Sequence, residues 1–322
     1  MPPQRVKTVA SISVGEFFKN HADKLNLVLL GTEIGFDRPI SEPAMNRPGL
    51  ALAGFFSYFA PKRVQVLGNS ELSYLKKLPD ALRSDRFRRM CDRDIPCIVV
   101  ARGADLGDDL LKVANQHAIP VFGTSMVTMN FLNAATIRLE HDFAPSVTVH
   151  GCMVDMRGIG ILIIGRSGAG KSETAIGLIE RGASLVADDM VSIKYVGGEL
   201  VATAPALSRG YMEIRGIGII HVPSLFGAAS VAGEKQVDLI ITLRRQSDAD
   251  CEADRVGGEV QYHAGILDVR VPQLVIPVAP GRDLVNIVET AAHEWRLRLA
   301  GHVAAQDLDE RIKRRLSGVS GE

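Results

Sequence analysis

The residues with the clearest chemical signature form a glycine-rich stretch that matches the pattern G-x-x-x-x-G-K-[ST]. They are Gly165, Arg166, Ser167, Gly168, Ala169, Gly170, Lys171 and Ser172. Glycines let such a loop curl so that its N–H groups point at phosphate oxygens. The ammonium of Lys171 can reach the β- and γ-phosphates, and the hydroxyl of Ser172 can ligate a magnesium ion. The pattern therefore predicts a chain that binds a nucleotide or a polyphosphate.

Two acids follow the loop at a spacing that suits phosphoryl transfer. Asp188 and Asp189 stand 17 and 18 residues after Lys171, at the end of the apolar run 183–187. Phosphoryl transfer needs a metal ion and a group that handles the proton of the attacking hydroxyl. An acid at a strand end can hold the water shell of the metal, and an adjacent acid can act as general base. The alternative is a pair of surface acids that cap a turn.

Three further side chains are candidates, and each has a structural alternative. Glu213 opens the segment 213–218, whose glycines permit a close approach of the backbone, so it is either a metal ligand or an exposed strand glutamate. His150, on the strand before the loop, either lies near the phosphates or has a structural role. Arg255 either neutralises charge in the transition state or is an ordinary arginine of a polar loop.

The elements beside the loop are those that the phosphate-binding pattern requires. The β-branched run 159–164 predicts a buried strand, and the helical spacing of apolar residues over 172–181 predicts a helix that ends at Gly182. The N-terminus of that helix adds positive potential where a phosphate would bind. Upstream, the alternating run 147–153 predicts one antiparallel strand that leads into the loop strand. The alternative is a glycine-rich turn that matches the pattern by chance. Such a turn would not need a buried strand before it and a helix after it.

The rest of the chain divides into two predicted domains. Residues 1–133 predict a small α/β domain with no recognisable catalytic constellation, and residues 134–322 predict the domain that carries the loop. In the first, strands at 95–100 and 119–122 with a helix between them predict a parallel strand–helix–strand unit. Residues 31–49, rich in glycine and proline, predict a loop.

Composition limits the possible partners. The chain has 322 residues, enough for two domains, and is 46% hydrophobic. Basic and acidic residues are equal at 37 each, so no net field favours nucleic acid or an anionic membrane, and we expect neither as a partner. No apolar run reaches the roughly 18 residues of a membrane span, and the first residues lack the apolar core of a signal peptide. Four cysteines without metal-binding spacing indicate buried thiols in a reducing cytoplasm.

The order of these motifs adds a resemblance to a known family. His150 with Gly151, the loop, and the segments 185–189, 212–220 and 278–282 occur in one order along the chain. Together they closely resemble the bacterial HPr kinase/phosphorylase family. The segments 47–56 and 66–69 also resemble the N-terminal domain of that family. The resemblance covers nearly the whole chain.

The resemblance implies an α/β fold in which a small N-terminal α/β domain, regulatory or used in assembly, precedes a P-loop kinase domain. The kinase domain would resemble the core of phosphoenolpyruvate carboxykinase. The family is bifunctional: it phosphorylates a serine of HPr, the phosphocarrier protein of the phosphotransferase system, with ATP or pyrophosphate. It also removes that phosphate by phosphorolysis with inorganic phosphate, which gives pyrophosphate. A magnesium cofactor and a homo-oligomer, a hexamer in the family, are implied as well.

Roles for individual residues come with the resemblance. His150, Lys171, the pair Asp188 and Asp189, and Arg255 would be catalytic. Family spacing from the lysine favours Asp189 as the base of the forward reaction and the acid of the reverse reaction. Ser172 and Glu213 would hold magnesium. The phosphorolysis segment of the family corresponds to Ile276, Pro277, Val278, Ala279, Pro280 and Gly281.

Two departures and two alternatives accompany this hypothesis. Arg166 stands where the family often has aspartate, which bears on nucleotide or phosphate preference. Ala279 stands where the family is often basic, which bears on the phosphorolysis activity. A small-molecule kinase or a carboxykinase-like enzyme on the same core would need a substrate pocket of converging cations, which the sequence does not show. A nucleotide-gated regulatory switch would have no need of a base, an acid and a second metal ligand.

Overall fold

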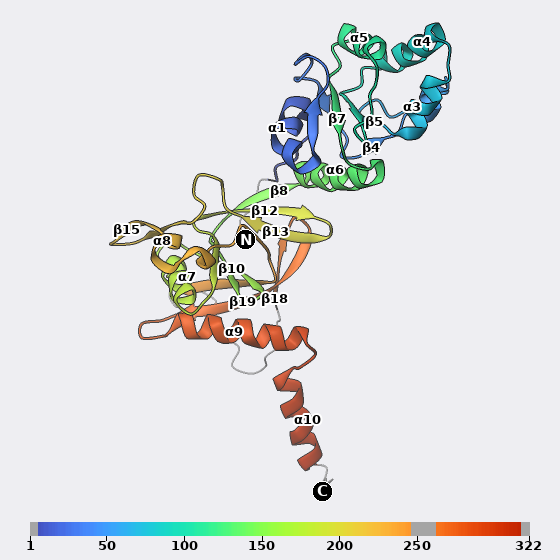
Figure 1. Cartoon of the computed structure of the whole chain (residues 1–322). Helices are drawn as coiled ribbons and strands as arrows, with labels where there is room; N and C mark the ends of the chain where they lie inside the picture. Colours follow the sequence, from blue (N-terminus) through green and yellow to red (C-terminus); the bar gives the residue numbers. More distant parts are fainter. Residues whose placement is uncertain (1–5, 246–261, 317–322) are drawn as a thin grey trace. The chain divides into compact units, whose positions relative to one another are not determined.

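The computed structural model describes residues 6–245 and 262–316, which form two compact units (Figure 1). Thr8–Ala144 is one unit, and the chain from Pro145 onward belongs to the other. The division therefore falls between Ala144 and Pro145 rather than at the expected 133. Helix α6 (Thr128–Phe143) runs through residue 133 without a break and ends just before Pro145.

The first unit is built on a five-stranded sheet. Its strands, in spatial order, are β2 (Leu27–Leu29), β7 (Val121–Thr124), β6 (Ile98–Val100), β5 (Val64–Leu67) and β4 (Met45–Asn46). The strands β4 to β7 run parallel, and β2 is antiparallel to β7. The parallel unit expected over 95–122 is confirmed as β6, α5 (Asp108–Gln116) and β7. The expected loop 31–49 instead contains β4 and β3 (Pro39–Ile40), and β3 pairs with β1 (Ile12–Ser13).

Helices cover both faces of this sheet, as a mostly parallel sheet requires. On one face, α2 (Gly49–Leu52), α3 (Asn69–Lys76), α4 (Asp80–Cys91) and α5 contribute side chains such as Phe87 and Leu110 to one core. On the other face, α1 (Val14–Leu25) and α6 contribute Phe17 and Phe131 to a second core. A capping box formed by Ser13 and Glu16 opens α1.

The second unit is built on a six-stranded sheet that contains the loop strand. Its strands, in spatial order, are β11 (Ser184–Ala187), β9 (Cys152–Met156), β10 (Ile159–Gly165), β17 (Leu239–Arg245), β19 (Val269–Val278) and β18 (Tyr262–Ile266). The strands β10, β17 and β19 run parallel, so their carboxyl ends lie at one edge. The strands β9 and β18 are antiparallel to their neighbours in this sheet.

A four-stranded sheet packs against the six-stranded sheet of the same unit. Its spatial order is β16 (Glu234–Gln236), β13 (Glu199–Thr203), β12 (Met190–Val196) and β8 (Ser146–His150). The single strand expected over 147–153 is therefore wrong, because Gly151 divides it between the two sheets. The backbone approaches closely there: a Cβ placed on Gly151 would lie 2.6 Å from the carbonyl oxygen of Ile163. Gly197 and Gly198 form the turn from β12 to β13.

The loop strand is buried on both sides, which explains its unbroken apolar sequence. Ile161 and Ile163 face the core that α7 (Lys171–Glu180) and α9 (Leu284–Leu299) cover. Leu162 and Ile164 face the core shared with the four-stranded sheet. Helices thus cover one face of the central sheet, and the second sheet covers the other (Figure 1).

The remaining elements lie outside these layers. The strands β14 (Tyr211–Ile214) and β15 (Gly218–His221) form a hairpin, followed by α8 (Val222–Phe226) and a 3-10 turn (Ala228–Ser230). Helix α10 (Ala304–Leu316) is an exposed helix near the C-terminus. None of the helices in the described part of the chain combines the length and apolar character needed to cross a bilayer.

Gly160 on β10 lies very close to the backbone of the second sheet. A Cβ placed there would lie 1.8 Å from the carbonyl oxygen of Gln236. The backbone at Gly160 is also held by two hydrogen bonds with Asp238, of 2.7 and 2.9 Å, and cannot move aside. We expect Gly160→Ala to lower the thermal unfolding midpoint of this unit by about 6 °C or more, from about 3 kcal/mol of overpacking.

The matched control is Gly265→Ala on β18 of the same sheet. A Cβ there would meet no heavy atom within 4 Å, so the melting temperature should stay within about 1 °C of the unmutated value. Differential scanning calorimetry compares the two variants. Equal melting temperatures for both would contradict the inferred steric role of Gly160.

Candidate active site

The glycine-rich loop joins the end of β10 to the start of α7, as the sequence predicts. Gly168 and Gly170 have φ angles of 73° and 92°, which favour glycine. The guanidinium of Arg245, at the end of β17, donates a 2.8 Å hydrogen bond to the carbonyl oxygen of Gly168. A Cβ on Gly168 would lie 2.8 Å from the same nitrogen. The loop conformation therefore depends both on glycine and on a cation from the neighbouring strand.

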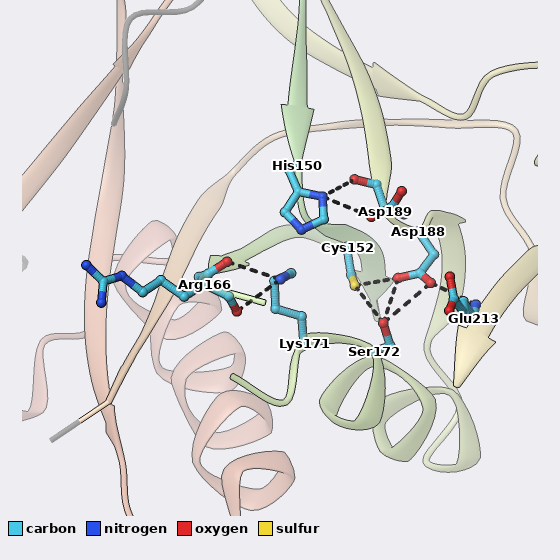
Figure 2. Close-up of polar contacts among 9 residues, drawn as sticks. His150, Cys152, Arg166, Lys171, Ser172, Asp188, Asp189 and Glu213 are labelled. Carbon is cyan, nitrogen blue, oxygen red and sulfur yellow. Dashed lines mark hydrogen bonds and ion pairs between the residues drawn. The ribbon is translucent and has the colours of Figure 1, made fainter. Parts of the chain in front are cut away.

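Lys171 lies under the loop with its ammonium turned inward. The residue is 7% exposed, and Nζ donates to the carbonyl oxygens of Gly165 at 3.1 Å and Arg166 at 3.3 Å. Figure 2 shows the side chain rising from the start of α7 toward these two carbonyls. The ammonium and the helix N-terminus together concentrate positive potential at the loop. Such a place suits a phosphate group.

Asp188 is the buried member of the acid pair. It is 6% exposed and follows the last residue of β11. Its carboxylate accepts hydrogen bonds from the Ser172 hydroxyl at 3.2 Å, the Glu213 backbone N–H at 3.2 Å and the Cys152 thiol at 2.6 Å (Figure 2). Three donors satisfy a charge that would otherwise be costly to bury. Asp188 thus joins the loop helix to the β14 hairpin.

Asp189 is the exposed member, and it faces His150. Its backbone has a φ of 63°, so the chain turns sharply between the two acids. Nδ1 of His150 lies 2.9 Å from Oδ1 of Asp189 and 3.1 Å from its carbonyl oxygen. Both side chains are more than half exposed, at 57% and 64%. The two consecutive acids therefore have different surroundings: Asp188 is buried and hydrogen-bonded inside the site, whereas Asp189 is exposed to the open side of the pocket.

These side chains line one open pocket of about 150 Å³. It brings together residues expected from the sequence and three that were not. The expected ones include His150, Ser167, Gly168, Gly170, Lys171, Ser172, Asp188, Asp189 and Glu213. The unexpected ones are Cys152, Glu173 and Arg215. Arg255 lies outside the described residues.

The segment 276–281 does not line this pocket, but the sheet register places it nearby. Gly165 pairs with Leu243, which in turn pairs with Ile276. The segment therefore leaves the sheet at the same edge as the loop. Leu284, at the start of α9, would lie 3.4 Å from a Cβ placed on Gly170. Just after the segment, Arg282 donates a hydrogen bond to the carbonyl oxygen of Pro277.

The donor set near Asp188 fits a magnesium ion. The Ser172 hydroxyl and the carboxylates of Asp188 and Glu213 offer hard oxygen ligands, which magnesium prefers. Within the described ranges, no group of three or more His, Cys, Asp or Glu side chains is placed to hold a metal ion by itself. Magnesium usually binds through one or two protein ligands together with substrate phosphates and water. A shared site of that kind is what these residues could form.

Besides Glu173 and Arg215, the residues that the sequence analysis did not assign to the site include Cys152, which lines the pocket, and Arg245, which contacts the loop. Arg245 ends a strand parallel to the loop strand, so the rule that carboxyl ends meet at one edge could have indicated it. Cys152 was expected to be a buried thiol, and it is buried. Its contact with Asp188 depends on the break at Gly151, for which the sequence has no signal.

The fold and the site together define a class: mixed α/β proteins that present a phosphate-type glycine loop at the carboxyl edge of a sheet. Two family models match the chain. One, described as the HPr Serine kinase C-terminal domain, covers residues 141–312, and the other, described as the HPr Serine kinase N terminus, covers residues 12–139. The chain belongs to the HPr kinase/phosphorylase family. The resemblance inferred from the motifs is thereby confirmed.

Individual relatives match over most of their length. The HPr kinase/phosphorylase of Clostridium perfringens (strain 13 / Type A) is 40% identical over 298 residues, which are 92% of this chain and 95% of that protein. The one from Caldicellulosiruptor bescii is 40% identical over 311 residues, 96% of this chain and 98% of that protein. A solved structure of the Hpr(Ser) kinase/phosphatase from Coxiella burnetii is 33% identical, covers 51% of this chain and 97% of that chain, and has a TM-score of 0.45.

The protonation of the buried thiols gives a prediction that can be checked without a substrate. Burial raises the pKa of Cys152 well above its usual value, and the negative charge of Asp188 raises it further. Burial likewise raises the pKa of Cys91 to about 12. At pH 8 a free cysteine is partly ionised, whereas these thiols stay protonated, and only the thiolate is alkylated. We expect iodoacetamide to modify both at least about a hundredfold more slowly than free cysteine at pH 8.

Peptide mapping by mass spectrometry after timed labelling measures each residue separately. The same protein in urea is the control, because unfolding restores the ordinary pKa and both thiols should then react. Labelling of Cys152 in the folded protein at the rate of free cysteine would show that this thiol is accessible and ionised, contrary to the geometry.

Proposed function

We propose that this protein is a bifunctional protein-serine kinase/phosphorylase of the phosphocarrier HPr. In the forward direction it transfers phosphate from ATP or pyrophosphate to a serine of HPr. In the reverse direction inorganic phosphate removes that group and pyrophosphate is released. Relatives named HPr kinase/phosphorylase over more than 90% of the chain support the activity. The observation that carries the mechanism is one pocket that combines Lys171, the Asp188–Ser172 contact and the Asp189–His150 pair.

The loop residues 165–172 would hold the donor phosphates in a P-loop kinase domain, related to the core of phosphoenolpyruvate carboxykinase. The loop N–H groups and the ammonium of Lys171 neutralise charge on the transferring group, which is the main catalytic need of phosphoryl transfer. Arg245 holds the loop through Gly168 and adds a second cation close by. Arg166 adds a third positive charge to the loop itself.

Ser172 and Glu213 would hold magnesium, with Asp188 between them. Asp188 accepts hydrogen bonds from the Ser172 hydroxyl and from the backbone of Glu213, so it sets the spacing of the two proposed ligands. Magnesium, when bound, would offset negative charge on the phosphates. The role of Asp188 is to position these groups, and its burial keeps it from reaching the substrate serine.

Asp189 would handle the proton. In the forward direction its carboxylate accepts the proton of the serine hydroxyl as the serine oxygen forms its bond to phosphorus. In the reverse direction the protonated acid returns that proton to the serine oxygen as the bond to phosphorus breaks. His150, bound to the same carboxylate through Nδ1, keeps it aimed at the open side of the pocket. Exposure of the pair lets a protein substrate approach.

The segment Ile276–Gly281 and Arg282 would serve the reverse reaction. That reaction needs inorganic phosphate held as the attacking group, in line with the serine phosphate. The segment leaves the sheet beside the loop by register, and Gly281 has a φ of 78°, so the backbone turns there. The guanidinium of Arg282 can pair with an oxyanion. Arg255 is proposed as a further catalytic cation on the family resemblance alone.

The wider setting follows from the same family resemblance. We propose that the enzyme works in the cytoplasm as a homo-oligomer, a hexamer, and that the unit Thr8–Ala144 has a regulatory or assembly role. Carbon metabolism through the phosphotransferase system would be the process it regulates.

One assay tests the proposed function as a whole. The protein is incubated with HPr, magnesium and ATP, and phosphoserine on HPr is followed by mass spectrometry. Inorganic phosphate is then added, and pyrophosphate is measured. We expect phosphorylation first and pyrophosphate after the addition. Phosphorylation without pyrophosphate would mean that the protein is a simple kinase. The absence of both products would overturn the proposal.

The proton-transfer role of Asp189 gives the next prediction. Asp189→Asn removes the base but keeps the shape, so the forward rate should fall by about 10²–10⁴. Microscopic reversibility requires the reverse rate to fall by a similar factor, since the same group serves both directions. Rates of HPr phosphorylation and of pyrophosphate release are measured on one preparation. Asp23→Asn, an exposed acid of α1, is the control and should leave both rates unchanged. A loss in one direction only would argue against this role.

Arg282 gives the complementary prediction. Arg282→Ala should spare ATP-driven phosphorylation and slow pyrophosphate release by about tenfold or more, because one cation for the attacking phosphate is lost. The matched control is Arg270→Ala, an exposed arginine at the other end of β19. Equal losses in both directions would mean that the segment supports the fold rather than phosphorolysis.

A further inference from the structure

Three arginines in the unit Thr8–Ala144 share one face of α4, and the proposed chemistry uses none of them. Arg86, Arg89 and Arg93 are spaced by three and four residues, so they follow one another along the helix and just past its last residue. Within the described residues, none of their guanidinium groups forms an ion pair or a hydrogen bond. The face therefore carries three positive charges without an acid to neutralise them.

The acids of α4 do not supply that neutralisation. Each acid of the helix, and the one directly after it, pairs with another side chain: Asp80 with Arg83, Asp85 with Arg88, and Asp92 with His117. Positive charges that lie close together repel one another. An anion that binds beside all three arginines would relieve this repulsion.

An aromatic ring holds two of the three guanidinium groups close to each other. The central guanidinium carbon of Arg93 lies 4.6 Å from the centre of the Phe56 ring, and that of Arg89 lies 5.9 Å from it. Both arginines are exposed. A guanidinium held over a ring is attracted to the ring face and keeps its N–H groups for other partners. Two sets of donors are thus placed beside each other and remain open to a ligand.

Arg86 lies against the backbone two residues before Phe56. Gly54 has a φ of 101°, and a Cβ placed there would overlap Nη1 of Arg86. The Nε atom of Arg86 is buried and has no hydrogen-bond partner. Native folds leave few buried donors unpaired, because each one is costly. The absence of a side chain at Gly54 therefore makes room for a cation whose own hydrogen bonds the fold does not satisfy.

The segment that contains Gly54 and Phe56 also exposes aromatic rings. Tyr58 is 93% exposed and Phe55 is 52% exposed. Neither side chain packs into the two cores of this unit. Exposed rings next to arginines offer a surface on which a planar base can stack, while the cations hold phosphate groups.

We propose that Arg86, Arg89 and Arg93 with Phe56, here called the arginine face, bind the phosphate groups of a small oligophosphate. Guanidinium groups pair with phosphate oxygens through two parallel hydrogen bonds. From Arg86 to Arg93 the backbone rises roughly 10 Å, which suits a short oligophosphate and is small for a protein interface. The ligand is either inorganic pyrophosphate or a nucleotide whose base adds a contact with Tyr58 or Phe55. This site belongs to a different unit from the loop 165–172.

Arginine labelling of the full chain tests the site residue by residue. Phenylglyoxal modifies accessible guanidinium groups, and peptide mapping by mass spectrometry gives the rate at each arginine. We expect saturating pyrophosphate, and in a separate arm ADP, to slow the labelling of Arg89 and Arg93 about fivefold or more, because bound phosphate occupies their N–H groups. Arg88, on the same helix and paired with Asp85, is the internal control and should react at an unchanged rate. Stronger protection by ADP than by pyrophosphate would identify a nucleotide as the ligand.

The double variant Arg89→Gln, Arg93→Gln gives a second readout. In isothermal titration calorimetry the unmutated chain should bind two molecules of pyrophosphate, one at the loop and one at the arginine face. In the double variant one of the two sites should be weakened about tenfold or more, since charged hydrogen bonds are lost. Arg88→Gln is the matched control and should keep both sites. Circular dichroism and the melting temperature verify that the variants are folded. A single site that the double variant loses would support the arginine face and contradict the proposed function of the loop.

Three results would overturn the inference. The first is an unchanged labelling rate of Arg89 and Arg93 in the presence of both phosphate compounds. The second is equal slowing by sodium chloride at the same ionic strength, or equal slowing at Arg88, which would show general screening of charge. The third is slowing by poly-glutamate and by neither phosphate compound, which would make the face a contact for an acidic protein segment.

Discussion

The buried carboxylate of Asp188 is the interaction on which the geometry of the site depends. A carboxylate at 6% exposure is costly unless its oxygens are hydrogen-bonded. Asp188 meets this requirement with donors from three other elements: Ser172 on α7, Cys152 on β9 and the backbone of Glu213 on β14. Each such bond to a charged group contributes about 1.5–3 kcal/mol. The loop helix and the hairpin are therefore held to the end of β11 by one side chain.

This constraint also separates two chemically identical neighbours. With Asp188 committed to the interior, the chain turns through a left-handed residue, and Asp189 is directed to the open pocket. Aspartate tolerates that conformation better than most residues, at a cost of about 1 kcal/mol. The environment, rather than the side-chain type, decides which acid can meet a substrate. The two residues by themselves could suggest only that one acid holds the metal side and the other handles the proton, and it was the family resemblance that favoured Asp189 as the base.

What the sequence could predict was local, and what it missed depended on long-range contacts. The glycine loop, its strand and its helix followed from pattern and periodicity, and so did the parallel unit around α5. The break at Gly151 did not, because an alternating run has the same sequence whether it stays in one sheet or crosses to another. Arg245 was missed for a related reason: its role depends on which strand lies beside β10, and that pairing joins residues about 80 apart in sequence. The boundary expected at residue 133 differs from the division between the two compact units because α6 continues to Phe143.

The position of the site follows from where the chain changes sheets. It crosses from the four-stranded to the six-stranded sheet at Gly151, between β8 and β9, and back again at Asp188 and Asp189, between β11 and β12. The two crossings are adjacent, since the N–H of Gly151 donates a 3.1 Å hydrogen bond to the carbonyl oxygen of Asp189. A corner of this kind leaves side chains uncovered by either sheet, yet its backbone is fixed by strand pairing on both sides, including His150 opposite Met190. His150 and Asp189 are therefore both exposed and rigidly placed, and the proton-transfer role proposed for Asp189 needs such a placement.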